Sequence, residues 1–136
     1  MKLNNPELLR SQCLINGEWC DALSGKREAV INPATGAELA SIPLVSEEET
    51  QQAIAAAQRA QNDWKQLTAK QRSALLLAWA DKVLAAQEDL AQLMTAEQGK
   101  SLAEARGEVA YAASFITWFA EEAKRVDGAV LQAPQA

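Results

Sequence analysis

The chain has two cysteines, Cys13 and Cys20, and its sequence limits the chemistry in which they can take part. The chain of 136 residues contains no histidine, so a serine or cysteine nucleophile activated by histidine is excluded within it. Zinc takes three or four Cys, His or carboxylate ligands, and two cysteines at this spacing do not favour such a site. In a reducing compartment they behave as small, half-buried apolar side chains, although they can also face each other across a hairpin.

The composition indicates a globular protein with an acidic surface. Hydrophobic residues make up 49% of the chain, which argues against disorder, and the net charge is −5. This charge disfavours nucleic acid and anionic membranes as partners. Residues 1–10 lack the apolar core of a signal peptide, and no apolar stretch reaches the roughly 20 residues of a membrane span. We therefore expect a cytoplasmic protein.

The pair Asn16 and Gly17 predicts a short β-hairpin after a polar lead-in. Asn-Gly between apolar residues is a strong signal for a two-residue hairpin turn. Ile15 and Trp19 are expected near the ends of its two strands.

Two further β-segments are expected at residues 29–31 and 38–42. The turn of residues 32–36, with the sequence NPATG, joins them, because proline fixes φ and glycine permits a positive φ. Pro43 is expected to end the last segment, since proline cannot donate a hydrogen bond to a β-ladder.

The apolar period then changes from two to 3.6 residues, which predicts four helices. Ser46, Thr68 and Ser101 are each followed three positions later by Glu or Gln, and such capping boxes open helices. Gly99 suits the position just past a helix end. The expected helices cover residues 46–63, a stretch beginning at Thr68, residues 88–99, and residues 101–126.

The long fourth helix carries apolar residues on two faces. Aliphatic and small residues form one face, namely Val109, Ala112, Ala113, Ile116 and Ala120. Aromatic residues form the other, namely Tyr111, Phe115 and Trp118, with Phe119 between the two. One apolar stripe suffices for a surface helix, so this helix is expected to be buried on both sides. The other helices can cover one side only, and we therefore expect a longer protein or a partner. An aromatic stripe is more typical of a core than of a substrate-lining wall.

Four stretches resemble, in order, motifs of the aldehyde dehydrogenase superfamily. They are residues 14–19 (LINGEW), 32–36 (NPATG), 94–105 (MTAEQGKSLAEA) and 111–125 (YAASFITWFAEEAKR). The last stretch is similar to bacterial succinate-semialdehyde dehydrogenases in particular. The resemblance extends over residues 14–125, which is nearly the whole chain.

This resemblance implies an α/β enzyme with a coenzyme domain, a catalytic domain and a β-arm used in homo-oligomerisation. The chain would be its N-terminal part, with short β-hairpins followed by four α-helices. In the family, a cysteine thiolate attacks a small-molecule aldehyde and hydride passes to NAD or NADP. Those catalytic and cofactor-binding residues match no position here, so the chain alone is expected to be inactive and to bind no cofactor. The surroundings of Cys13 do not match those of the family nucleophile.

A few site residues can be transferred from the family by position. Tyr111 matches a position that lines the substrate tunnel, and Phe115 lies one helical turn further on. A monovalent cation is often held by backbone carbonyl groups before the NP turn and by an acidic side chain before the GK pair. These positions correspond to Val30, Ile31 and Glu97, and oxygen ligands suit a hard cation. A solvated carboxylate near a helix end is the alternative for Glu97.

The predicted organisation has four parts. These are a lead-in at residues 1–12, β-hairpin segments at 13–45, the helical part of a coenzyme-binding domain at 46–128, and the truncated start of a following segment at 129–136. The alternative hypothesis is a self-contained helical domain for interaction or oligomerisation, without catalysis. Its two-sided helix would then be covered by self-association.

Overall fold

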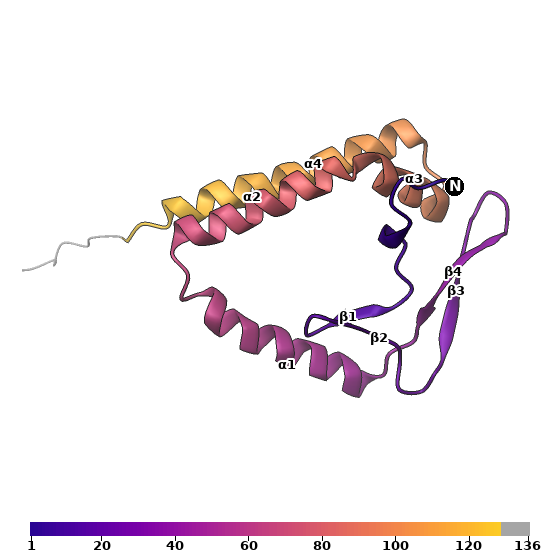
Figure 1. The fold of residues 1–136 in the computed structure, drawn as a ribbon, viewed down its shortest axis with the longest axis horizontal. Coiled ribbons are helices and arrows are strands. Elements are labelled where there is room, and N and C mark those ends of the chain that lie inside the picture. Colours follow the sequence, from indigo (N-terminus) through magenta and orange to yellow (C-terminus); the bar gives the residue numbers. More distant parts are fainter. Residues whose placement is uncertain (129–136) are drawn as a thin grey trace, which may run out of the picture.

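The computed structural model describes residues 1–128, and within them two β-hairpins precede four α-helices (Figure 1). The strands are β1 (Cys13–Ile15), β2 (Glu18–Cys20), β3 (Arg27–Ile31) and β4 (Glu38–Pro43). The helices are α1 (Glu47–Trp64), α2 (Ala69–Ala85), α3 (Gln87–Gln98) and α4 (Leu102–Glu122), with short 3₁₀ turns at Pro6–Leu8 and Ala123–Arg125. The predicted order of hairpins and helices is confirmed. The segment predicted at residues 129–136 lies outside the described residues.

The β1–β2 hairpin forms where the Asn-Gly signal predicted it. Asn16 has a φ of 53° and Gly17 a φ of 83°, so both turn residues have the left-handed conformation that a tight hairpin turn requires. The antiparallel register pairs Cys13 with Cys20, directly opposite each other. The two cysteines therefore face each other across the hairpin.

The β3–β4 hairpin is longer than predicted. β3 begins at Arg27, and β4 includes Pro43 as its last residue, paired with Arg27. The prediction that Pro43 lies beyond the strand is therefore wrong, because a strand's terminal position does not need the missing N–H donor. The register shifts between Val30 and Ile31, so that Leu39 is an extra residue on β4.

The helix ends follow the predicted local signals. The capping boxes at Ser46, Thr68 and Ser101 each have both reciprocal hydrogen bonds. Gly99 caps α3 with a φ of 78°. The fourth helix is shorter than predicted, since its last residues continue as the 3₁₀ turn Ala123–Arg125. Among the described helices, none is both long and apolar enough to cross a membrane.

The core lies along the seam between α2 and α4, which run in opposite directions side by side, with α3 against the start of α4 (Figure 1). The buried apolar residues on these three helices are mostly small. They are Ala80, Ala91, Leu93, Ala96, Ala105, Val109, Ala113 and Ala120. Small side chains allow the helix backbones to approach closely, so added volume at these positions is costly. Helix α1 makes few contacts with the other helices and lies apart from them (Figure 1).

The described residues cover only one of the two apolar faces of α4. Val109 is 4% exposed, whereas Tyr111 is 65% and Trp118 is 62% exposed. The prediction that the other helices cover a single side is therefore confirmed. Ala112, which the periodicity groups with Val109 on one face, is exposed, whereas Val109 is buried. Ala112 lies at the edge of the stripe, where no neighbouring helix reaches it.

The N-terminal lead-in is anchored to α3 by the buried carboxylate of Asp89. Its Oδ1 accepts hydrogen bonds from the backbone N–H of Asn4 (2.8 Å) and the side-chain amide of Asn4 (3.1 Å). Its Oδ2 accepts one from the backbone N–H of Asn5 (2.9 Å). This carboxylate therefore holds the start of the chain against a helix more than 80 residues further on.

Acid is expected to weaken this anchor. The N–H groups of Asn4 and Asn5 hold the pKa of Asp89 below its ordinary value of 3.8, because they stabilise the charged form. Such a group contributes fully to stability above its unfolded-state pKa, and the contribution is lost as pH falls through the folded-state pKa. Urea unfolding should show stability decreasing below about pH 4, and less steeply in Asp89→Asn. Equal pH dependence in the two proteins would contradict this assignment.

Candidate functional site

Tyr111 and Phe115 form an edge-to-face aromatic pair on the uncovered face of α4. Their ring centroids are 4.7 Å apart, with an interplanar angle of 77°. The Ser114 hydroxyl donates to the Tyr111 backbone carbonyl at 2.6 Å. Both aromatic rings are exposed, Tyr111 by 65% and Phe115 by 47%. The pair forms an apolar surface, one helical turn long, against which a substrate or another protein segment can pack.

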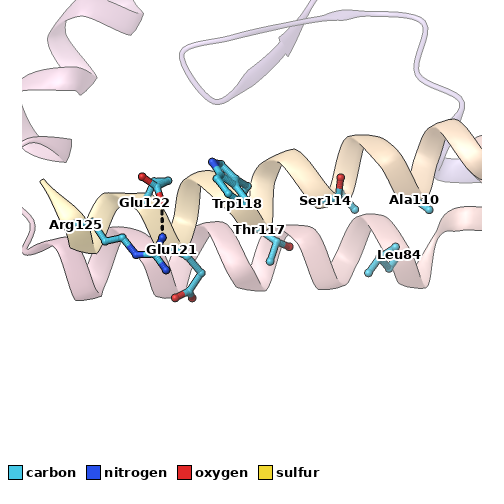
Figure 2. A pocket seen from close by; sticks show the side chains of 9 residues that line it. Leu84, Ala110, Ser114, Thr117, Trp118, Glu121, Glu122 and Arg125 are labelled. Atoms are coloured by element: carbon cyan, nitrogen blue, oxygen red, sulfur yellow. Dashed lines mark hydrogen bonds and ion pairs between the residues drawn. The ribbon is translucent and has the colours of Figure 1, made fainter.

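A groove of about 480 Å³ is lined by residues of α4 and α2 (Figure 2). Leu84 of α2 and Thr117 of α4 lie along it, with Trp118 beside them. Its far end is charged, with an ion pair of 2.7 Å between Arg125 and Glu122. The side chains along this groove include no thiol or imidazole, so it offers apolar contact rather than a nucleophile.

The NPATG turn contacts the C-terminal end of α3, which brings two of the resembling stretches together. Asn32 shapes this turn by accepting hydrogen bonds from the backbone N–H groups of Ala34 (2.9 Å) and Thr35 (3.2 Å). A Cβ atom built on Gly99 would lie 3.1 Å from Cγ of Pro33. The turn is therefore packed tightly against the α3 cap.

Two of the three predicted cation-site residues line one cavity near this contact. Val30 and Glu97 both line a cavity of about 220 Å³ between the β3–β4 hairpin and α3, whereas Ile31 is not part of its lining. Ile31 is 46% exposed, because consecutive residues of a strand face opposite sides and Val30 faces the cavity.

The donor set of this cavity fits a cation only in part. Glu97 is the acidic residue in the lining, and Arg10 lines the same cavity, with its guanidinium over the ring of Trp19 (5.0 Å to the centroid). The positive charge of Arg10 disfavours a cation nearby. The remaining ligands of a cation would have to be backbone carbonyl oxygens, which suit a hard monovalent ion. Within residues 1–128, no three His, Cys, Asp or Glu side chains are grouped as metal ligands.

Sequence reasoning missed two buried carboxylates that hold the scaffold of this region. Besides Asp89, Glu49 accepts hydrogen bonds from the backbone N–H groups of Ser46 and Leu23, both at 2.8 Å. These bonds hold the pKa of the Glu49 carboxyl below its usual value. The capping box predicted the bond to Ser46. No local signal predicted the bond to Leu23, which ties α1 to the loop after β2.

Comparison with known proteins gives a consistent result. A family model described as "Aldehyde dehydrogenase family" matches residues 19–136. The chain is 54% identical over its whole length to the succinate-semialdehyde dehydrogenase [NADP(+)] of Escherichia coli (strain K12), and covers 28% of that relative. It is 55% identical over 128 residues to the glutarate-semialdehyde dehydrogenase of Pseudomonas putida, covering 94% of this chain and 27% of the relative.

Solved structures agree with the sequence comparison. The crystal structure of an E. coli NADP-dependent enzyme superposes with a TM-score of 0.97 at 53% identity. Succinate-semialdehyde dehydrogenase from Burkholderia pseudomallei superposes with a TM-score of 0.96 at 51% identity. In both cases 99% of this chain and 28% of the other chain are covered, in the N-terminal part of the relatives. The chain therefore belongs to the aldehyde dehydrogenase family.

Proposed function

We propose that this chain is the N-terminal part of the coenzyme-binding domain of an NAD(P)-dependent aldehyde dehydrogenase that oxidises succinate semialdehyde to succinate. The supporting observation is the 54% identity, over the whole chain, to a succinate-semialdehyde dehydrogenase. Other relatives are named for glutarate semialdehyde, aspartate semialdehyde and 3-sulfolactaldehyde. All four compounds carry an aldehyde and a separate acidic group, so we propose a short aldehyde with a distal anion as the substrate class.

The proposed reaction passes through a cysteine thioester, whose nucleophile is not one of the two cysteines here. Cys13 and Cys20 lie in the β1–β2 hairpin, which Figure 1 shows well apart from α4. A nicotinamide cofactor would supply the hydride acceptor for this oxidation. The 136 residues of this chain would contribute helices that support the coenzyme domain and one wall of the substrate tunnel. We expect a cytoplasmic homo-oligomer.

The function is tested with the protein encoded by the longest reading frame that contains this chain. Nicotinamide absorbance would follow oxidation of succinate semialdehyde and of butanal, which has four carbons but no carboxylate, with NAD+ and with NADP+. We expect kcat/KM to be at least about 100-fold higher for succinate semialdehyde, because a site built for an anion rejects a neutral analogue. The chain of residues 1–136 should give no turnover. Turnover by it alone, or no preference for the acid, would refute the proposal.

Tyr111 and Phe115 are proposed to line the tunnel through which this aldehyde reaches the nucleophile. Tyr111→Ala removes a large apolar contact, and in the same enzyme we expect KM for the aldehyde to rise about tenfold with a smaller change in kcat. Ala103→Ser, at an exposed position of α4, is the matched control and should leave both constants unchanged. If Tyr111→Ala behaved like this control, the tunnel assignment would be wrong.

We also propose that Glu97, with the backbone carbonyl groups of Val30 and Ile31, holds a monovalent cation. The partial fit of the cavity supports this only if the backbone supplies most of the ligands. Thermal unfolding in potassium chloride and in choline chloride tests it. The midpoint temperature of unfolding should be higher in potassium chloride than in choline chloride. The Glu97→Gln variant should unfold at the same midpoint temperature in both salts. Equal midpoints in the two salts would exclude the site.

One observation favours the alternative of a helical oligomerisation domain without catalysis. Exposed apolar residues occur on α2 as well as on α4, since Leu75 and Trp79 are 54% and 56% exposed. Exposed apolar surface of this kind can be covered by a second copy. Measurement of the mass of the 136-residue chain in solution distinguishes the two functions, because the alternative requires a stable oligomer and the enzyme proposal does not.

A further inference from the structure

We propose that Cys13 and Cys20 are a reversible redox pair, which closes to a disulfide across the β1–β2 hairpin when a low-molecular-weight disulfide such as glutathione disulfide oxidises them. Both cysteines are free and half-buried, so neither is sealed from a small reagent. The Sγ of Cys20 donates to the backbone carbonyl of Cys13 at 3.4 Å. The thiol of Cys20 is therefore already directed at the partner strand.

The strand register gives the separation that a disulfide needs. Cys13 and Cys20 are directly paired in an antiparallel ladder. Paired residues in such a ladder have Cα atoms about 4.5–5.5 Å apart and side chains on the same face. Disulfides form at Cα separations of about 4.4–6.8 Å. The separation expected for this pairing lies within the disulfide range, so we expect rotation of the two side chains to close the bond without a large backbone movement.

Both ends of the hairpin are held, which keeps the thiols opposite each other. The tight turn fixes one end. At the other end, Asp21 accepts hydrogen bonds from the side chains of Gln12 (2.9 Å) and Arg27, and Arg27 also donates to the backbone carbonyl of Ser11 (2.5 Å). The Gln12–Asp21 bond crosses the hairpin base beside the cysteines, and Arg27 bridges Ser11 and Asp21 at the same place. They limit fraying there and raise the effective concentration of one thiol at the other.

The reaction is an ordinary thiol–disulfide exchange. One cysteine thiolate attacks a sulfur of glutathione disulfide, forms a mixed disulfide and releases one glutathione thiolate. The second cysteine then attacks the mixed disulfide, forms the Cys13–Cys20 bond and releases the second glutathione. The two cysteines lose two electrons and two protons, and one glutathione disulfide is reduced to two glutathione molecules. Excess glutathione reverses the sequence.

The pair can be followed in one peptide. Trypsin cleaves after Arg10 and Lys26, so both cysteines lie in the peptide of residues 11–26. The folded protein is equilibrated in glutathione buffers of increasing oxidised fraction, then alkylated, digested and weighed by mass spectrometry. We expect this peptide to become two hydrogens lighter and to escape alkylation at both cysteines together. Mixed disulfides alone, disulfides between two protein molecules, or full alkylation at every buffer ratio would overturn the proposal.

Two variants test the geometric argument. Arg27→Gln removes the clamp at the hairpin base, and we expect it to lower the effective concentration of the thiols about tenfold. Lys26→Gln removes the same charge from the adjacent exposed residue and should leave the effective concentration unchanged. Cys13→Ser should yield only the mixed disulfide between Cys20 and glutathione, which shows that the remaining thiol is accessible. If Arg27→Gln left the effective concentration of the thiols unchanged, the contacts of Arg27 at the hairpin base would not have the role we assign to them.

Discussion

Replacement of Gly99 by alanine is expected to lower the free energy of unfolding by about 2 kcal/mol. The φ of 78° at this helix cap costs a residue with a Cβ atom about 1–2 kcal/mol. The new Cβ would also lie 3.1 Å from Cγ of Pro33, in the turn packed against the α3 end. Urea unfolding followed by tryptophan fluorescence measures the change.

Gly107, on the next helix, provides a control, because its replacement by alanine is expected to change the free energy of unfolding in the opposite direction. It lies inside α4, and a Cβ atom there would meet nothing within 4 Å. Gly107→Ala should therefore stabilise the protein by about 0.5–1 kcal/mol, because alanine favours the helix. If both variants changed stability in the same direction, the contact between the turn and the α3 cap would not be the constraint we describe.

Ala105→Leu is expected to destabilise the protein by about 3 kcal/mol, at the upper end of the range for overpacked cores. Ala105 is 0% exposed and lies in the first turns of α4, which pack against α3 (Figure 1). Three added carbon atoms have no free space there, so either α3 or α4 must shift. The same urea titration gives the free energy, and the m-value shows whether the native state also loosens.

Ala103 is the matched control for this overpacking. It lies two residues earlier on the same helix and is exposed. Ala103→Leu adds the same volume at a surface position, where substitutions usually change stability by about 0.5 kcal/mol or less. A similar loss in both variants would show that leucine at the start of α4 is unfavourable in itself and that close packing against α3 is not the cause.

The parts of the fold that were predictable depend on residues close together in the chain. A capping box such as Ser46 with Glu49 involves four consecutive residues, and the Asn16–Gly17 turn involves two. Both formed as predicted because local hydrogen bonds and φ preferences decide them. The contacts of Asp89 with Asn4 and Asn5 were not predictable, since they join distant segments whose meeting depends on the whole arrangement.

The candidate site shows the same division. The periodicity of α4 separated Val109 from Tyr111 correctly, because helical geometry alone assigns residues to faces. It also grouped the exposed Ala112 with the buried Val109, because the width of the covered stripe depends on where α2 and α3 pack. Val30 and Glu97 line one cavity, whereas Ile31, the next residue of β3, faces the other side of the strand. No local sequence pattern places the end of α3 beside this strand.

The Asp89 anchor makes the chain a closed ring (Figure 1). Starting at Asn4, the path runs through both hairpins, α1 and α2 to α3, and returns to Asn4 through hydrogen bonds of 2.8–3.1 Å. Helix α1 makes few contacts with other elements, so the segments before and after it in the chain determine its position. Without the Asp89 anchor, the ring would still be closed where the β3–β4 hairpin and its NPATG turn pack against α3, and Glu49 would still tie the start of α1 to Leu23.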